Sequence, residues 1–203
     1  MSTGEPQPLS SAQRHLLAAA TEAFAELGFG GTSTRDIAAR ANRSPAAVYI
    51  HHESKEDLLF AISVRGHETA LACLREAAEA STDPVARVQG MVFAFSLWHM
   101  DHAKLGRVVQ YEFRAMTEEH REQISALRRR IQRLMVAAIE DGVARGHFEV
   151  LNARQAAEAL LSLSIDLVRW FDPERRRDRR AIARQHADLA TRMLRRDPVC
   201  DHH

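Results

Sequence analysis

The chain has 203 residues, enough for one small and one medium-sized domain or for a single compact one. A hydrophobic content of 45%, few Gly and Pro residues and abundant Ala, Leu, Arg and Glu favour an all-α protein with a real core. No long apolar run is present, so no membrane span is expected, and the net charge of +1 gives the whole chain no basic footprint for nucleic acid.

The start of the chain and its cysteines indicate a cytoplasmic protein. Residues 1–9 are polar and lack the apolar segment of a signal peptide, so we expect a disordered tail there. The two cysteines, Cys73 and Cys200, are isolated and do not make a disulfide framework. A redox-sensing pair is the alternative interpretation.

The first predicted helix covers Ser10 to Leu27. Leu16, Ala20, Phe24 and Leu27 recur at intervals that place them on one helix face. A glycine-rich segment over residues 28–31 ends this helix.

Residues 34–59 predict two short helices, a tight turn between them, and the start of a longer helix. Thr34 is expected to cap the first helix, and Asn42 tolerates the left-handed conformation that the turn needs. Ser44 and Pro45 begin the second helix, and Ser54 begins a capping box for the third. This arrangement is a helix-turn-helix, which places one helix in the DNA major groove. A generic helical corner is the alternative, since small side chains suit any close helix crossing.

The remaining pattern predicts a helical body. A long helix from Lys55 to about Ala80 connects it to the small domain, Asp83 caps the next helix, and a break near residues 101–104 separates two more. Thr117 and Asn152 cap later helices, the second of which continues apolar to Phe171. About nine helices result. The predicted division is a tail at 1–9, a DNA-binding domain at 10–54, a ligand-binding and dimerisation domain at 55–197, and a flexible tail at 198–203.

The first sixty residues carry three motifs in close succession: Leu16-Leu17-x-x-Ala20-x-x-x-Phe24-x-x-x-Gly28-Phe29-x-x-Thr32-Ser33-x-x-x-Ile37-Ala38, Ser44-Pro45-x-x-x-Tyr49-x-His51 and Ser54-Lys55-x-x-Leu58-Leu59. Together these motifs resemble the N-terminal domain of TetR/AcrR-type transcriptional regulators. Two departures are Asn42, where the family usually has Gly, and His52, where it usually has Phe. The resemblance implies a ligand-responsive regulator that binds double-stranded operator DNA, most simply a homodimeric repressor released by a small hydrophobic effector.

The charge of this segment restricts how it contacts DNA. Residues 1–60 carry five basic and seven acidic side chains, a net charge of −2, so phosphate contacts must come from a few placed cations and from helix N-termini. No Asn, Gln or Arg lies between Pro45 and His51, so apolar contacts to thymine methyl groups are expected there, with Arg35 and Arg43 for guanine. Tyr49, His51 and Lys55 would hold phosphates. The predicted DNA-binding set is Thr34, Arg35, Arg43, Ser44, Pro45, Ala46, Ala47, Tyr49, Ile50, His51 and Lys55.

Residues 91–116 are rich in large side chains that either form core or line a ligand cavity. Trp98, His99, His102 and Tyr111 combine apolar bodies with polar tips, which favours a cavity. The spacing of His99 and His102 would suit a metal ion, but no third ligand is in register, and we expect neither a metal nor a cofactor.

The C-terminal part contains a second set of short motifs: Asp83-Pro84, Arg87, Gly90, Glu140-Asp141-Gly142, Gly146-His147-Phe148 and Arg169-Trp170-Phe171. With these residues it resembles, more loosely, the members of this family that respond to acyl-CoA thioesters in lipid or steroid catabolism. It implies an acyl group in the aromatic cluster and CoA phosphates near Arg169 and residues 175–177, although an Arg-rich helix start can also be merely solvated. The predicted ligand set is Phe95, Trp98, His99, His102, Tyr111, Arg169 and Trp170.

Two C-terminal helices carry more apolar surface than a small domain can cover. Their small and apolar residues predict a two-fold dimer in which both helices meet their copies in a four-helix bundle. A monomer with a thick core is the alternative. The predicted interface is Ala156, Ala159, Leu160, Leu163, Leu167, Ile182, His186, Leu189 and Met193.

The sequence gives less support to other classes of function. It has no Gly-rich phosphate loop, no Cys/His metal quartet and no G-x-S-x-G motif, so an enzyme is not expected. A helical ligand-carrying or scaffold protein without DNA binding, or a regulator of a different lipophilic compound or drug, is the alternative. The sequence does not reveal the operator, the regulated genes, the effector, or whether the effector induces or co-represses.

Overall fold

The structure is a computed structural model that describes residues 10–49, 52–172, 174 and 177–195, with only the backbone at Ala47 and Tyr49. These residues form ten α-helices, one short 3-10 turn and no strand, which confirms the all-α prediction. The elements are α1 (Ser11–Gly31), α2 (Thr34–Arg40), α3 (Pro45–Tyr49), α4 (Lys55–Glu79), α5 (Pro84–Asp101), α6 (Ala103–Tyr111), η1 (Phe113–Ala115), α7 (Glu118–Ala144), α8 (Ala153–Ile165), α9 (Leu167–Trp170) and α10 (Arg179–Leu194).

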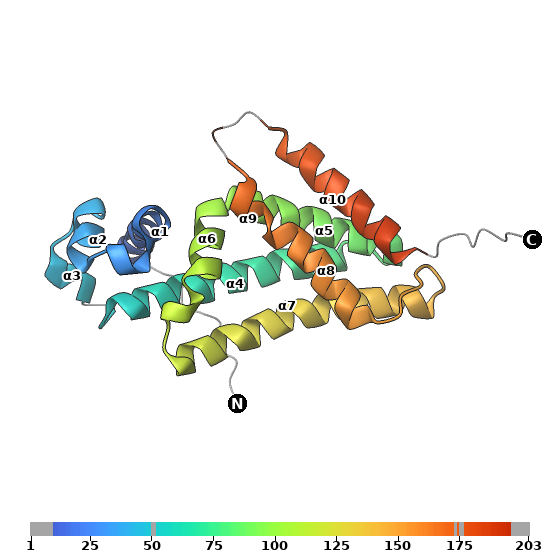
Figure 1. Ribbon diagram of the computed structural model, residues 1–203, viewed down its shortest axis with the longest axis horizontal. Coiled ribbons are helices and arrows are strands. Elements are labelled where there is room, and N and C mark those ends of the chain that lie inside the picture. Colours follow the sequence, from blue (N-terminus) through green and yellow to red (C-terminus); the bar gives the residue numbers. More distant parts are fainter. Residues whose placement is uncertain (1–9, 50–51, 173, 175–176, 196–203) are drawn as a thin grey trace, which may run out of the picture.

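The helices form a small head and a larger body, and α4 belongs to both (Figure 1). Helices α1 to α3 make the head at one end of the molecule. Helix α4 runs from the head along the body, where it packs between α5 and α7, while α8 lies against α7 and α10 against α5. One straight helix therefore extends from the head into the interior of the body.

The caps of the head follow the sequence closely, with one correction. The N-cap of α2 is Ser33 and not Thr34: the Ser33 Oγ accepts the Asp36 N–H at 3.2 Å, and the Asp36 carboxylate accepts the Ser33 N–H at 2.8 Å. The acidic residue at the third helical position favours this cap because it completes a reciprocal pair. Gly28 (φ 71°) breaks the end of α1, and Asn42 (φ 51°) takes up the predicted left-handed conformation in the turn.

The apolar core of the head extends past the predicted boundary at residue 54. Leu16, Phe24 and Ile37 pack with Leu58 and Leu59 of α4, all 4% exposed or less. The same cluster includes residues 108, 116 and 124, which come from α6, the segment after η1 and α7. The head is therefore held on the body by apolar contacts in addition to its covalent connection.

The body confirms the predicted helix starts and one predicted break. The side chains of Asp83, Thr117 and Asn152 each accept a backbone N–H at the start of α5, α7 and α8. Helix α5 ends at Asp101 and α6 begins at Ala103, as expected. The main core lies between α4, α5, α7, α8 and α10.

The predicted continuous helix over residues 156–171 is wrong. It breaks at Asp166 into α8 and the single turn of α9, and the Asp166 carboxylate accepts two hydrogen bonds from Arg169, at 2.8 and 2.9 Å. Helix α9 packs on α6 at Gly106, where an added Cβ would lie 2.5 Å from Val168. A straight continuation of α8 would lose this contact.

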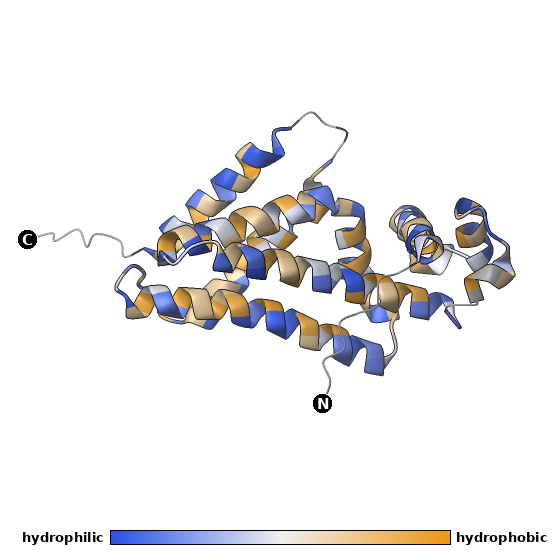
Figure 2. Ribbon diagram, turned by 180° about the vertical axis from the view of Figure 1, so that it is seen from behind, coloured by the Kyte–Doolittle hydropathy of each residue, from blue (hydrophilic) through white to orange (hydrophobic). Residues whose placement is uncertain are grey.

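The helices are amphipathic, with apolar and polar positions alternating around their surfaces (Figure 2). Within the described residues, no helix is both long enough and apolar enough to cross a membrane.

Candidate ligand cavity and DNA-reading head

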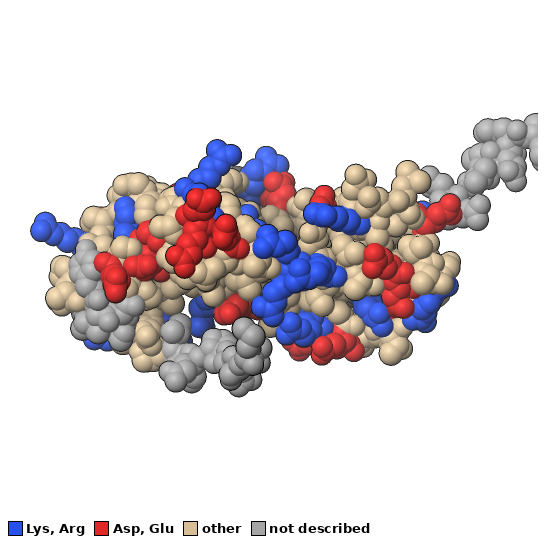
Figure 3. All heavy atoms as spheres, turned by 90° about the horizontal axis from the view of Figure 1, so that it is seen from below, with Lys and Arg blue, Asp and Glu red and all other residues tan. Residues whose placement is uncertain are grey.

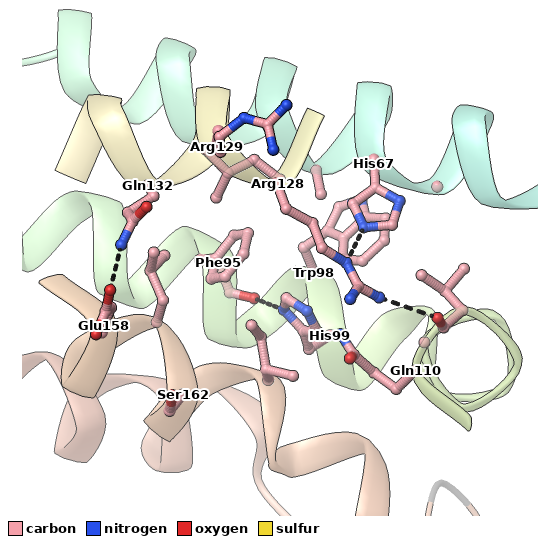
Figure 4. Close-up of a pocket in the computed structure, with 17 residues that line it drawn as sticks. His67, Phe95, Trp98, His99, Gln110, Arg128, Arg129, Gln132, Glu158 and Ser162 are labelled. Carbon is pink, nitrogen blue, oxygen red and sulfur yellow. Dashed lines mark hydrogen bonds between the residues drawn. The ribbon is translucent and has the colours of Figure 1, made fainter. Parts of the chain in front are cut away.

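The body contains a cavity of about 310 Å³ between α4, α5, α6, α7 and α8. Most of its lining surface is apolar, with large side chains such as Phe95 and Trp98, while eight of the 17 lining residues are polar or charged (Figure 4). An apolar wall that carries several polar groups is typical of a small-molecule site. The lining residues are Gly66, His67, Ala70, Phe95, Trp98, His99, Gly106, Val109, Gln110, Arg128, Arg129, Ile131, Gln132, Glu158, Leu161, Ser162 and Ile165.

Two buried histidines lie in the cavity wall, and both are neutral near pH 7. Their exposed fractions are 6% for His67 and 4% for His99. Burial lowers the pKa of each from 6.5 to about 4. Each Nδ1 lies 2.8 Å from the backbone carbonyl of the residue four positions earlier, so the neutral ring carries its proton on Nδ1 and donates it there. The Nε2 atoms are therefore acceptors.

Arg128 uses one of these acceptors. Its Nε donates to His67 Nε2 at 3.2 Å, and its Nη2 donates to the Val109 carbonyl at 3.2 Å. The guanidinium also lies 4.4 Å from the centre of the Phe113 ring. Figure 4 shows the Arg128 side chain between His67 and His99. The guanidinium is thus fixed on the cavity wall by three uncharged groups.

The cavity opens between α7 and α8, where its lining residues are exposed or half-buried. Gln132 of α7 donates to Glu158 of α8 at 2.7 Å across this opening. Ser162 and Arg129 are exposed there. Arg129 also borders a surface groove with Phe113 and Arg121. Figure 3, seen from the side of α7, shows basic side chains gathered near the middle of this face, beside a group of acidic ones.

The structure brings together three of the seven predicted ligand residues. Phe95, Trp98 and His99 line the cavity. His102 is exposed and stacks on Trp98 from outside, with ring centres 4.6 Å apart. Tyr111 is 59% exposed and does not line the cavity, because the last turn of α6 places it on the surface.

Arg169 and Trp170 are also in a different place from the one predicted. The break at Asp166 carries them onto α9, away from the opening of the cavity. Arg169 is exposed and paired with Asp166, and Trp170 borders a separate groove on α10. Arg175 and Arg176 of the predicted phosphate cluster lie outside the described residues, and Arg177 faces the Trp170 ring at 5.8 Å.

Sequence reasoning missed His67 and Arg128, which are hydrogen-bonded to each other in the cavity wall. It also missed the other polar lining residues, Gln110, Arg129, Gln132, Glu158 and Ser162. Arg128 follows directly after Leu127 in the apolar stripe of α7, and His67 follows Gly66 on the buried face of α4. A charged residue next to a helix's apolar stripe was the available signal. Its partner lies 61 positions away, which no local pattern reveals.

The head presents its predicted DNA-contacting side chains in part. Arg35, Arg43, Ser44, Pro45 and Ala46 are exposed, and Thr34 is half-buried in the first turn of α2. The side chains of Ala47 and Tyr49, and the whole of Ile50 and His51, lie outside the described residues. These assignments stay predictions.

Lys55 has a structural role that the sequence did not suggest. Its ammonium donates to the carbonyls of Phe29 at 2.6 Å and Thr32 at 2.7 Å, and it lies 4.3 Å from the Phe29 ring centre. It ties the start of α4 to the end of α1. Only one of its three N–H donors is left for the phosphate contact predicted for it.

A second connection joins α4 to α7 at the base of the head. His120 Nδ1 lies 2.9 Å from the Glu56 carboxylate, and the Thr117 N–H donates to the same carboxylate at 2.9 Å. The His120 ring stacks on Phe60 with ring centres 3.7 Å apart. Glu56, Asp57 and His120 form the one close group of three metal-type ligands among the described residues. His99 and His102 are not in it.

The predicted dimer residues divide into two groups. Leu160 (1% exposed), Leu167 (0%) and His186 (8%) are buried in the protomer's own core, so they were wrongly assigned to an interface. The sequence pattern showed them to be buried but could not show by which helix. Ala159, Leu189 (40%) and Met193 (56%) are exposed, and Ala156, Leu163 and Ile182 are half-buried.

Comparison with known proteins places this architecture in a family. Residues 16–62 match the model of the bacterial regulatory proteins of the tetR family, and residues 81–194 match the model of the tetracyclin repressor-like C-terminal domain. The transcriptional activator FasR of Mycolicibacterium smegmatis is 28% identical over 174 residues, 85% of this chain and 78% of FasR. The transcriptional repressor KstR2 of Mycobacterium tuberculosis is 28% identical over 169 residues, 81% of this chain and 84% of KstR2.

Solved structures agree with this result. A tetR-family regulatory protein from Rhodococcus RHA1 has a TM-score of 0.88 and 39% identity, covering 93% of this chain and 100% of the other. AibR, solved with isovaleryl coenzyme A and operator DNA, has a TM-score of 0.79 and 24% identity over 91% of this chain and 98% of its own, which shows a common fold. The chain belongs to the TetR family of bacterial, DNA-binding transcriptional regulators.

Proposed function

We propose that this protein is a homodimeric repressor that leaves its operator when the acyl group of an acyl-CoA thioester enters the cavity between α4, α5, α6, α7 and α8. The observation that carries the proposal is the cavity itself, because its walls are apolar, it is open at one side, and it borders the helix that enters the head. As a DNA-binding regulator it would act in the cytoplasm.

The size of the cavity favours a short acyl group. A volume of about 310 Å³ is at the lower end of the range for ligand sites and holds about ten water molecules. A nucleotide does not fit within it, so the CoA moiety would stay outside the opening between α7 and α8. AibR, a structural neighbour, was solved in complex with isovaleryl coenzyme A, the thioester of a short acid, which supports this size class.

The phosphates of CoA would then meet α7 in place of the predicted Arg169. Arg129 stands at the opening and is the phosphate contact we propose; the surface groove that it shares with Arg121 also contains Glu118 and Glu122. Guanidinium groups suit phosphates because their fork of N–H donors matches two oxygen atoms. Arg169 has its N–H groups on Asp166 and is not at the opening.

Two helices connect the cavity to the head. Helix α4 carries His67 in the cavity wall and Lys55 against the carbonyls of α1, twelve residues and about 18 Å apart. Helix α7 carries Arg128 in the cavity wall and His120 against Glu56 of α4. A ligand that binds better to one spacing of α4 and α7 would therefore shift the head, and only such a difference in affinity can change DNA binding.

The head would bind DNA as one of two copies. One head offers few basic side chains, so two heads on half-sites one helical turn apart are needed for useful affinity. The exposed apolar side chains of Trp170, Leu189 and Met193 on α9 and α10 supply a surface for the second copy. The direction of the response follows KstR2, a repressor, whereas FasR is an activator of equal similarity.

Gel-shift titration of labelled DNA from the protein's own upstream region tests the DNA-binding part. We expect a shift that weakens steeply between 50 and 200 mM salt, as about six or more phosphate contacts produce, and that reverses on addition of hexanoyl-CoA. Sedimentation at micromolar concentration should show a dimer. A monomer that still shifts the DNA would contradict the dimer, and DNA binding that ignores acyl-CoA thioesters would contradict the effector class.

A further inference from the structure

The wall of the cavity carries a positive charge that no acidic side chain compensates. Arg128 bonds to the neutral His67 ring and to a backbone carbonyl, and lies against an aromatic ring. No ion pair of Arg128 occurs among residues 10–49, 52–172, 174 and 177–195. Burial lowers the pKa of Arg128, and no nearby acid opposes that shift.

The carboxylate that lines the cavity does not fill this role. Glu158 is exposed on α8 at the opening, and it accepts a hydrogen bond from Gln132 at 2.7 Å. In Figure 4 Glu158 and Gln132 lie together at one side, while Arg128 lies at the other side with His67 and His99. A guanidinium stays charged at all physiological pH values, and a half-buried charge without a counterion is unfavourable. The site is therefore complementary to an anion.

We propose that the effector's apolar part ends in a carboxylate, and that this carboxylate binds Arg128. The ligand class is a short aliphatic chain with a free acid group at the end that enters the cavity. This inference rests on the proposed function, since it specifies the chemistry of the ligand of the same cavity. The chain can come from two sources: a free fatty acid, or the CoA thioester of a dicarboxylic acid, in which the second carboxyl group is free.

The neutral histidines make this arrangement specific. His67 Nε2 accepts from Arg128 Nε, which fixes the plane of the guanidinium while leaving its Nη1 without a hydrogen-bond partner within the described structure. Because His67 and His99 are uncharged near pH 7, Arg128 is the cation on the wall beyond Arg129, which stands at the opening. An alkyl chain of the same length without the acid would cover that half-buried guanidinium and leave it uncompensated, so it should bind more weakly.

Calorimetric titration of the full-length protein with three probes tests the inference: adipyl-CoA, hexanoyl-CoA and hexanoate. We expect adipyl-CoA to bind at least about tenfold more tightly than hexanoyl-CoA, because charged hydrogen bonds contribute at that scale. Arg128→Met should abolish this ratio. Arg129→Met, which removes the neighbouring exposed arginine at the opening, should weaken both thioesters together and keep the ratio.

The ratio of affinities separates a ligand contact from a structural role. Arg128→Met loses an uncompensated half-buried charge together with its hydrogen bonds to His67 and to the Val109 carbonyl, so its unfolding midpoint can move in either direction. A variant that folds and still binds adipyl-CoA about tenfold more tightly than hexanoyl-CoA would overturn the inference. The wild-type ratio of the two thioesters decides the question even if the variant does not fold.

The outcomes distinguish this inference from the proposed function. Equal affinity for adipyl-CoA and hexanoyl-CoA overturns the carboxylate and leaves the acyl-CoA effector intact. Binding of hexanoate alone, lost in Arg128→Met, supports the carboxylate and identifies a free acid as its source, against the CoA thioester. Failure of all three probes to bind overturns both.

Discussion

The two buried histidines of the cavity predict a loss of stability in mildly acidic solution. His67 and His99 have a pKa of about 4 in the folded protein, against 6.5 for an unperturbed histidine. Below pH 6.5 the unfolded chain therefore binds protons that the folded protein does not, and protonation favours unfolding. The contribution of the two neutral histidines to the free energy of unfolding is therefore complete above pH 6.5, and it is lost progressively as the pH falls from 6.5 to about 4.

The magnitude follows from the two pKa values. Between pH 7.5 and pH 5.5 each histidine should lower the free energy of unfolding by about 1.4 kcal/mol, or roughly 3 kcal/mol for the pair. Domains of ordinary stability have only about 5–15 kcal/mol in total, so the effect should be easy to measure. The carboxylates of Glu26, Asp36 and Asp166 have pKa values below their ordinary values of 4.5 and 3.8, so their contribution to stability is lost mainly below pH 4.5, under the range of the assay.

The assay is urea unfolding at pH 7.5 and 5.5, at one fixed protein concentration because a dimer's stability depends on concentration. The control is the double variant His67→Gln/His99→Gln, whose amides do not titrate and whose oxygen atoms can still accept a hydrogen bond. The stability of the wild type should fall by roughly 3 kcal/mol more than that of the variant. His186, whose pKa is also lowered by burial, is present in both proteins and cancels. Equal losses in both proteins would refute the reasoning.

Two further predictions concern packing and the head. An added Cβ at Gly142 would lie 2.1 Å from the Phe148 ring, so Gly142→Ala should lower the free energy of unfolding, measured in urea, by about 1–3 kcal/mol. Gly30→Ala is the control: an added Cβ there meets nothing within 4 Å, so the free energy of unfolding should not fall. Equal effects would contradict this packing. Lys55→Gln removes the charged hydrogen bonds between the start of α4 and the end of α1. It should lower DNA affinity tenfold or more in gel shifts, while the free energy of unfolding falls by about 1–3 kcal/mol. Unchanged DNA affinity would refute the role of these hydrogen bonds in placing the head.

Local signals in the sequence were sufficient for most of the helices. The caps at Ser54, Asp83, Thr117 and Asn152 each need only a polar side chain and a nearby N–H, so their positions could be read from a few residues. The cap at Ser33 was displaced by one position because Ser33 and Thr34 are both capping residues. The Asp36 carboxylate selects Ser33 because it accepts the Ser33 N–H and completes the capping box.

The cavity could be predicted only in part, because its walls come from five helices. The aromatic and histidine-rich run on α5 indicated Phe95, Trp98 and His99, which do line the cavity, and their contact with a ligand stays a prediction. Arg169 and Trp170 were misplaced since the break at Asp166 depends on the contact between α9 and Gly106 of α6, about sixty residues away. The pairing of Arg128 with His67 is non-local for the same reason.

Leu160, Leu167 and His186 were misassigned to the dimer interface because of a related ambiguity. A helix that is apolar on several sides is buried on several sides, but the pattern does not say whether its own chain or a second copy covers it. Leu160 and Leu167 are covered by their own chain. The exposed Leu189 and Met193 are the residues that a second copy would cover.

The central claim is that the cavity and the DNA-reading head are coupled through α4 and α7. Fluorescence anisotropy of labelled upstream DNA, with and without saturating hexanoyl-CoA, tests it for the wild type and for Ser162→Trp, which would block the opening with a side chain on the exposed face of α8. We predict that hexanoyl-CoA weakens DNA binding of the wild type by about 5–150-fold, and that Ser162→Trp binds DNA as tightly as the wild type but does not respond. A thioester that binds the protein and leaves its DNA affinity unchanged would contradict the account, as would a full response in Ser162→Trp.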